Sequence, residues 1–173
     1  MPLDPQLLTG IGSALSIFLA SAGSAIASSH SGIYAVRKND MKSFVPIIIS
    51  GVLAIYGIIV SVLLIGKFKD DISQVDGYRN LSAGLAVGLA CCASGLGIAN
   101  FIKQINEREG AHTYYPGQRT EITTPLISAD ASPNTQGPRP APPASFLHLT
   151  LSLFFLEAIG LYGLIVALFL IGN

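Results

Sequence analysis

Apolar residues in this chain gather into four long blocks that are separated by polar segments. The blocks run over about 9–36, 44–66, 81–102 and 146–172. Each block is close to the roughly 20 residues that a helix needs to cross a bilayer. The pattern therefore predicts an all-α membrane protein with four transmembrane helices. An even number of crossings places both ends of the chain on one side of the membrane.

The polar segments between the blocks differ in length and composition. A first hairpin occupies 1–66, and a loop of mixed charge follows over 67–80. The segment 103–145 holds most of the prolines together with Ser, Thr, Asn and Gln, which is typical of an exposed, irregular loop. We expect this segment to be an insertion between the third span (81–102) and the fourth, which ends the chain over 146–173.

The second and fourth blocks are copies of one another. Residues 51–66 align without gaps on 157–172 at an offset of 106, and seven of 16 positions are identical, including Tyr56 with Tyr162. The first and third blocks match more loosely, at an offset near 70. The chain is therefore predicted to be a duplicated helical hairpin, with 103–145 as the inserted length.

Glu157 is the only acidic residue in the fourth block. An ionised acid at the centre of a membrane helix costs at least about 2.5–3.5 kcal/mol, so such a residue marks a functional site, most often on an ion or proton path. In the repeat Glu157 falls on Gly51, so two hairpins carry one carboxylate. The alternative is an acid paired for structure, but no Lys or Arg lies inside another apolar block to pair with it.

Small residues in the first and third blocks predict close helix packing. Gly84 and Gly88 form a GxxxG pair, Gly95 continues the same ridge, and Gly23 lies among small residues of the first block. Small residues at four-residue spacing let helix backbones approach closely in a bilayer. The second and fourth blocks are bulkier. In a ring we therefore expect the first and third helices on the inner circle and the other two toward lipid.

Composition excludes several classes of protein. Of 173 residues, 50% are hydrophobic and 12% are charged, about half the charged share of soluble domains. The formal net charge is zero, which gives no case for nucleic-acid binding. Cys91 and Cys92 are adjacent within an apolar block and are interpreted as small hydrophobic residues. We expect no metal site, no cofactor and no catalytic constellation, so the chain itself is not expected to be an enzyme.

Basic residues are divided unequally between the two sides of the membrane. The first and third connections carry seven: Arg37, Lys38, Lys42, Lys103, Arg108, Arg119 and Arg139. The opposite side carries three: Lys67, Lys69 and Arg79. Because Lys and Arg favour the cytosolic side, we expect the first and third connections in the cytosol. The loop 67–80 and both termini would then be lumenal.

The residues of the four blocks resemble one family. The segment 155–168, with Glu157 at its third position, is similar to the fourth-helix signature of the proteolipid c subunits of vacuolar-type (V-type) proton ATPases. Segments 54–62 and 82–90 are similar to the second and third helices of that family, and 21–32 is more loosely similar to the first. The acid in the fourth helix resembles subunit c more than its paralogue c″, where the acid is expected in the other repeat.

That resemblance implies a ring of such subunits, a c-ring, which rotates against the stator subunit a. Glu157 would be the essential proton-binding residue, neutral in lipid and ionised opposite an Arg supplied by subunit a, and subunit d of the central stalk would be a further partner. The subunit would be a non-catalytic part of a pump that acidifies vacuolar, lysosomal or endosomal-type compartments. Cys91, where the family has Gly, and the 103–145 insertion depart from the family pattern.

Few other side chains are candidates for lining an ion site. The candidates are Ser50 and Gly51, which the repeat places at the level of Glu157, and Tyr162, five residues after it. Sodium needs several oxygen ligands, and the second to fourth blocks hold no Gln or Thr near the acid, so we expect the transported ion to be H⁺. Packing between subunits accounts for Tyr162 equally well.

Two other functions remain open from the sequence. A structural four-helix membrane channel or scaffold protein would not need Glu157 to change its charge. A ring subunit of an F-type-like enzyme is disfavoured, because such subunits are usually a single hairpin. The four apolar blocks exclude a soluble enzyme.

Overall fold

The computed structural model describes residues 4–68, 72–113 and 146–172, and these residues form four long helices. They are α1 (Pro5–Lys38), α2 (Val45–Ile65), α3 (Gln74–Thr113) and α4 (Phe146–Gly172), with a short 3₁₀ helix, η1 (Met41–Phe44), before α2. All four long helices are apolar enough to cross a membrane. The predicted all-α membrane fold with four transmembrane helices is confirmed.

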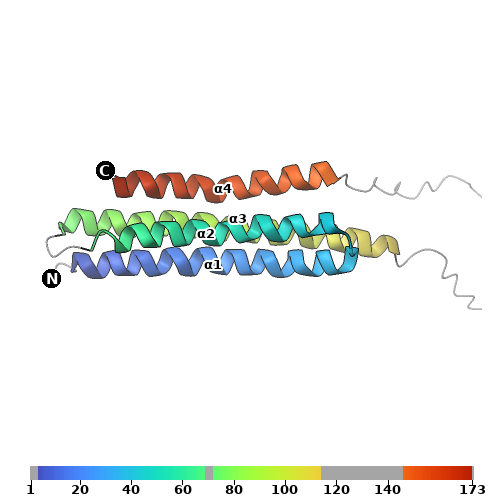
Figure 1. Ribbon diagram of the computed structural model, residues 1–173, viewed down its shortest axis with the longest axis horizontal. Helices are drawn as coiled ribbons and strands as arrows, with labels where there is room; N and C mark the ends of the chain where they lie inside the picture. Colours follow the sequence, from blue (N-terminus) through green and yellow to red (C-terminus); the bar gives the residue numbers. More distant parts are fainter. Residues whose placement is uncertain (1–3, 69–71, 114–145, 173) are drawn as a thin grey trace, which may run out of the picture.

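The four helices lie side by side along the long axis of the molecule (Figure 1). α1 begins after Asp4, whose side chain accepts a hydrogen bond from the backbone N–H of Gln6 at 3.2 Å. It ends at Asn39, which adopts the left-handed conformation (φ 48°) that commonly stops a helix. The start of α1 and the end of α4 lie at the same end of the bundle, as an even number of crossings requires (Figure 1).

α3 is longer than the sequence predicted at both of its ends. It begins at Gln74, within the expected loop, and it continues to Thr113. Residues 103–113 are therefore helical, where we expected an irregular segment. The remainder of the predicted loop, 114–145, lies outside the described residues.

The extension of α3 at its C-terminal end has two local causes. The first proline after the third span is Pro116, so no residue in the first part of the predicted loop breaks a helix. Lys103 and Glu107 stand one helical turn apart, with Nζ and Oε1 at 4.0 Å, and such pairs support an exposed helix. The width of the bilayer sets the shortest helix that can cross it, and it does not set where the helix ends.

Glycines bring α1 and α3 into close contact. A Cβ added to Gly84 would meet the backbone of Gly12, and a Cβ added to Gly95 would meet the backbone of Gly23. A Cβ on Gly23 would in turn lie 2.7 Å from the Cα of Cys92. There is no room for a side chain at these positions, so the two backbones touch over much of the span.

Serine hydroxyls join α1 to α2. The hydroxyls of Ser28 and Ser50 lie 2.8 Å apart, and the hydroxyl of Ser16 donates to the carbonyl of Gly57 at 3.3 Å. Hydroxyl groups within a membrane-spanning bundle need such partners, because hydrocarbon offers none. These bonds fix the height of α2 relative to α1.

α4 is the most peripheral helix and packs mainly against α3. Only 22% of its membrane-spanning stretch is buried inside the molecule, against 39% to 44% for the other three helices. Lys67, just after α2, donates a hydrogen bond to the carbonyl of Ile171 in the last turn of α4, where the helix dipole favours a cation. The closely packed pair α1–α3 is thus flanked by two bulkier helices.

We predict that Gly95→Ala destabilises the bundle and that the matched variant Gly32→Ala does not. A Cβ at residue 95 would meet the backbone of Gly23, whereas a Cβ at residue 32 has no atom within 4 Å. We expect Gly95→Ala to cost about 1–3 kcal/mol, measured as a lower Tm of the detergent-solubilised protein. Equal Tm values for the two variants would contradict the close contact of α1 with α3.

Candidate functional site

The site is built around Glu157, the acid near the middle of α4. Its side chain is half-buried, and its Oε1 accepts a hydrogen bond from the hydroxyl of Tyr56 on α2. The bond joins residues from different copies of the repeat. A carboxyl and a phenol therefore meet between two membrane-spanning helices.

The direction of side chains on a helix explains how Tyr56 reaches Glu157. In the repeat Tyr56 lies five residues after Gly51, the position equivalent to the acid. Helical side chains tilt toward the N-terminus of their own helix. Because α2 and α4 run in the same direction (Figure 1), the hydroxyl at the end of the tyrosine ring comes level with the carboxyl.

The other close neighbours of this pair are apolar or weakly polar. A Cβ added to Gly160, one turn after Glu157, would lie 2.6 Å from Cδ2 of Leu53 and 3.5 Å from Sγ of Cys91. Leu53 and Cys91 are fully buried. No group of three or more His, Cys, Asp or Glu side chains within the described ranges could hold a metal ion. The arrangement is suited to holding one carboxyl next to one hydroxyl.

The main chain of α4 is held at the same turn. The hydroxyl of Ser94 on α3 donates to the carbonyl of Leu156, the residue before Glu157, at 2.6 Å. A Cβ added to Gly97 would lie 3.1 Å from Cδ2 of Leu156, so the absence of a side chain at residue 97 lets the leucine approach α3. Two helices thus meet α4 at this turn: α3 contacts its backbone and α2 contacts its acid.

Three of the predicted site residues make no hydrogen bond to the acid within the described part of the chain. Ser50 is buried and pairs with Ser28, and a Cβ added to Gly51 would have no atom within 4 Å. Tyr162 leaves 64% of its surface exposed. In the described part of the chain, the hydrogen-bond partner of Glu157 is Tyr56 and not Ser50 or Tyr162.

The four glycines predicted for helix packing lie at contacts between α1 and α3. Gly84, Gly95 and Gly23 face backbone atoms of the opposite helix, as described above. A Cβ added to Gly88 would lie 3.1 Å from the backbone oxygen of Leu15 on α1. These glycines set the spacing of the helices and do not line the site.

Sequence reasoning did not single out Tyr56 or Ser94. A signal for Tyr56 was present in the repeat, which aligns it with Tyr162 and so puts a tyrosine in each bulky helix. The alignment gives equivalent positions within two helices, but it does not show which of the two tyrosines faces the acid. Nothing in the sequence distinguishes Ser94 from the other serines of the small-residue helices.

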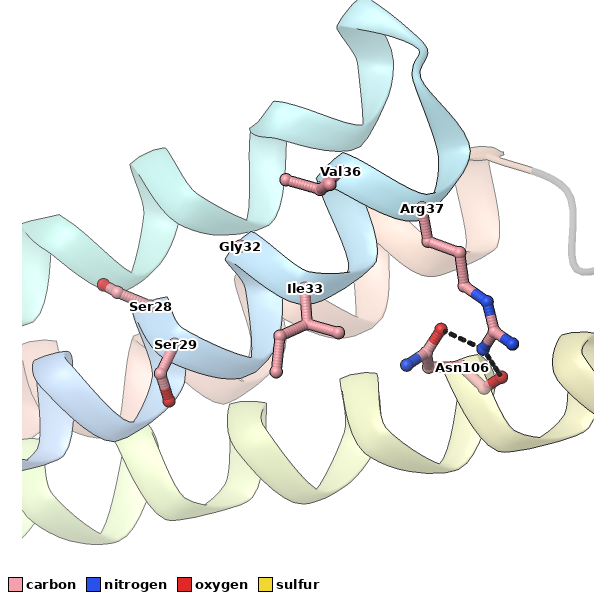
Figure 2. A pocket seen from close by; sticks show the side chains of 7 residues that line it. All are labelled: Ser28, Ser29, Gly32, Ile33, Val36, Arg37 and Asn106. Atoms are coloured by element: carbon pink, nitrogen blue, oxygen red, sulfur yellow. Dashed lines mark hydrogen bonds between the residues drawn. The ribbon is translucent and has the colours of Figure 1, made fainter.

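An open pocket of about 620 Å³ lies near the C-terminal end of α1 (Figure 2). In it, Nη1 of Arg37 donates to Oδ1 and to the backbone oxygen of Asn106 on α3, at 2.9 and 3.1 Å. The pocket includes neither Glu157 nor Tyr56. Its lining residues are Ser28, Ser29, Gly32, Ile33, Val36, Arg37 and Asn106.

The chain is similar over most of its length to curated proteins of one kind. It is 33% identical to subunit c′ of the V-type proton ATPase of Saccharomyces cerevisiae, over 98% of this chain and 90% of that protein. It is 32% identical to the subunit c′ of Candida glabrata over the same shares. The 16 kDa proteolipid subunit c of the V-type proton ATPase of Homo sapiens is 35% identical, over 75% of this chain and 64% of that protein. No protein-family model matches the chain.

We predict that Tyr56→Phe makes Glu157 keep its proton to a higher pH, and that Tyr162→Phe does not. A hydrogen bond donated to a carboxylate favours the ionised form, and Phe cannot donate it. A carbodiimide reacts with a protonated carboxyl, so the labelling of Glu157 should persist about half to one pH unit higher in Tyr56→Phe. Tyr162, the repeat counterpart, is the matched control, and identical labelling profiles for both variants would contradict the pairing seen here.

Proposed function

The chain belongs to the proteolipid subunits of V-type proton ATPases, and we propose that it carries protons as a subunit of the membrane rotor ring. In this proposal Glu157 binds and releases one proton in each passage of the stator subunit a. The observation that carries the proposal is a single carboxyl near the middle of the most peripheral helix, hydrogen-bonded to Tyr56. The subunit itself would be non-catalytic, and ATP would be hydrolysed by other subunits of the complex.

The proposed carrier depends on the high cost of a charge in the hydrocarbon core of the bilayer. Hydrocarbon strongly disfavours an ionised carboxylate, so Glu157 is protonated wherever its helix faces lipid. A neutral acid can travel around the ring, and an ionised one cannot leave the stator. Rotation driven by ATP hydrolysis would then move protons in one direction, because the charged form is confined to the interface with subunit a.

At the stator the environment must favour the charged form. A water-filled half-channel and an Arg of subunit a would stabilise the carboxylate of Glu157 there, as an opposite charge close by does. The proton would leave toward the lumen, and a second half-channel from the cytosol would supply the next proton. The hydroxyl of Tyr56 can turn its hydrogen toward a carboxylate or accept from a carboxylic acid, so it fits both states.

The arrangement of the helices fits a ring of such subunits. The pair α1–α3 has backbones in contact, so it is narrow and suits the inner circle, whereas α2 and α4 carry exposed apolar side chains that suit lipid and neighbouring subunits. One acid then serves four helices. With one acid per four helices instead of one per two, the ring would move fewer protons for each ATP consumed. Such a pump can work against a steeper proton gradient.

The neighbours of the acid favour H⁺ over Na⁺ as the transported ion. A sodium ion must exchange its water shell for several oxygen ligands. Among the described residues, the hydroxyl bonded to Glu157 is that of Tyr56, and Leu53 and Cys91 lie against Gly160 at the next turn. A proton needs only the carboxyl.

The surroundings of the subunit follow from the same proposal. Both termini would be lumenal, in a membrane of the vacuolar, lysosomal or endosomal type, because the connections richer in Lys and Arg favour the cytosol. Subunit d of the central stalk would meet the cytosolic end of the ring. Lipid and other c-type subunits would cover the rest.

We predict that Glu157→Gln abolishes acidification while the ring still assembles. Glutamine keeps the size and the hydrogen-bonding capacity of the acid, but it cannot release a proton. ATP-driven acidification of vesicles that contain the complete complex should fall to background, with normal amounts of the subunit in the purified ring. The matched control is Glu107→Gln, an exposed acid on α3 that should leave acidification unchanged. Acidification that survives Glu157→Gln would refute the proposed function and favour a structural role.

A further inference from the structure

We infer that Ser94 and Ser16 are positioning residues that hold the two helices on either side of the proton site. Ser94 on α3 bonds the carbonyl of Leu156, which precedes Glu157, and Ser16 on α1 bonds the carbonyl of Gly57, which follows Tyr56. Each serine thus fixes the main chain next to one partner of the Tyr56–Glu157 bond. The inference rests on the proposed function, since it assigns these serines a role at its proton site.

In both hydrogen bonds a serine hydroxyl donates to a carbonyl on another helix, but the two bonds differ in length. The Ser94 hydroxyl lies 2.6 Å from its carbonyl on α4. The Ser16 hydroxyl lies 3.3 Å from the carbonyl of Gly57 and 2.8 Å from that of Ser13, so it is shared between two acceptors. Both serines are fully buried. We therefore expect Ser94 to contribute more than Ser16.

Ser94 does not satisfy an otherwise unpaired group. Leu156 lies within a continuous helix, where its carbonyl already accepts from the residue four positions later. Serines on helices usually bond a carbonyl three or four residues back on their own helix, as Ser29 does with Ile26 and Ser82 with Tyr78. Ser94 instead reaches across to α4. Its bond fixes one helix relative to another.

α4 has particular need of such a bond. It buries the smallest share of its span, so a hydrogen bond that fixes its height and rotation matters more there than in the other helices. Ser94 acts at the turn that holds the acid, where Cys91 also lies against Gly160. When Glu157 gains or loses its proton, its side chain can then move while its backbone stays level with Tyr56.

The titratable side chains that face Glu157 are few. In the described part of the chain they are Tyr56 from α2, which donates to the carboxyl, and Cys91 from α3, whose Sγ would lie 3.5 Å from a Cβ on Gly160 one turn after the acid. If a serine variant changes the proton affinity of Glu157, we therefore attribute the change to a different alignment of Glu157 with these two groups. Because Tyr56 donates directly to the carboxyl, it is the group through which a shift of α4 would act.

The test is the pH profile of carbodiimide labelling of Glu157 in the intact complex. Ser94→Ala should move the midpoint upward by about 0.3 to 0.5 pH unit, since a displaced α4 weakens the bond that favours the carboxylate. Ser16→Ala should give a smaller shift in the same direction. The control is Ser82→Ala, because the hydroxyl of Ser82 bonds the carbonyl of Tyr78 on its own helix and joins no two helices, and its midpoint should not move.

A double variant separates positioning from a general loss of stability. If Ser94 acts through Tyr56, then Ser94→Ala should cause no further shift in a Tyr56→Phe background. An unchanged midpoint in Ser94→Ala, or shifts that simply add in the double variant, would overturn the inference. The acidification measurement on Glu157→Gln tests the proposed function separately. A failure of the serine inference can therefore be told apart from a failure of the proposed function.

Discussion

Unpaired charges and polar groups are costly in a bilayer, and this constraint shapes most of the molecule. It requires helices for the spans, because only a helix satisfies its own backbone in hydrocarbon. It requires partners for the hydroxyls of Ser16, Ser28 and Ser94, which bond across to neighbouring helices. It also makes Glu157 stand out as a candidate functional residue, because an ionised acid near the middle of a membrane-spanning helix is costly.

The sequence was sufficient for the parts of the fold that hydrocarbon dictates. Four blocks of membrane length predicted four spans, and the structure has four such helices. The end of α3 at Thr113 could not be predicted, because a bilayer sets only the shortest length of a span. The acid Glu157 was visible because it interrupts an apolar block, whereas its partner Tyr56 lies in another span and is recognised only when α2 and α4 are side by side.

The helices rich in small residues (α1 and α3) and the helices rich in bulky residues (α2 and α4) have different roles in the bundle. Gly84 and Gly95 let α3 touch the backbone of α1, so this pair forms a closely packed layer. α2 and α4 lie on that layer and are joined to it by serine bonds and packing, which leaves most of their apolar surface free. A closely packed layer with a site on its outer helices is what a carrier needs when its acid must meet lipid and a stator in turn.

The duplication explains why the two tyrosines have different surroundings. Each copy supplies one tyrosine at the same position, but only the second copy supplies an acid, since Gly51 stands where the first would have it. Tyr56 meets the acid within the chain, whereas Tyr162 is 64% exposed. The same residue type in the two copies therefore has different surroundings, because only one copy places a carboxyl within its reach.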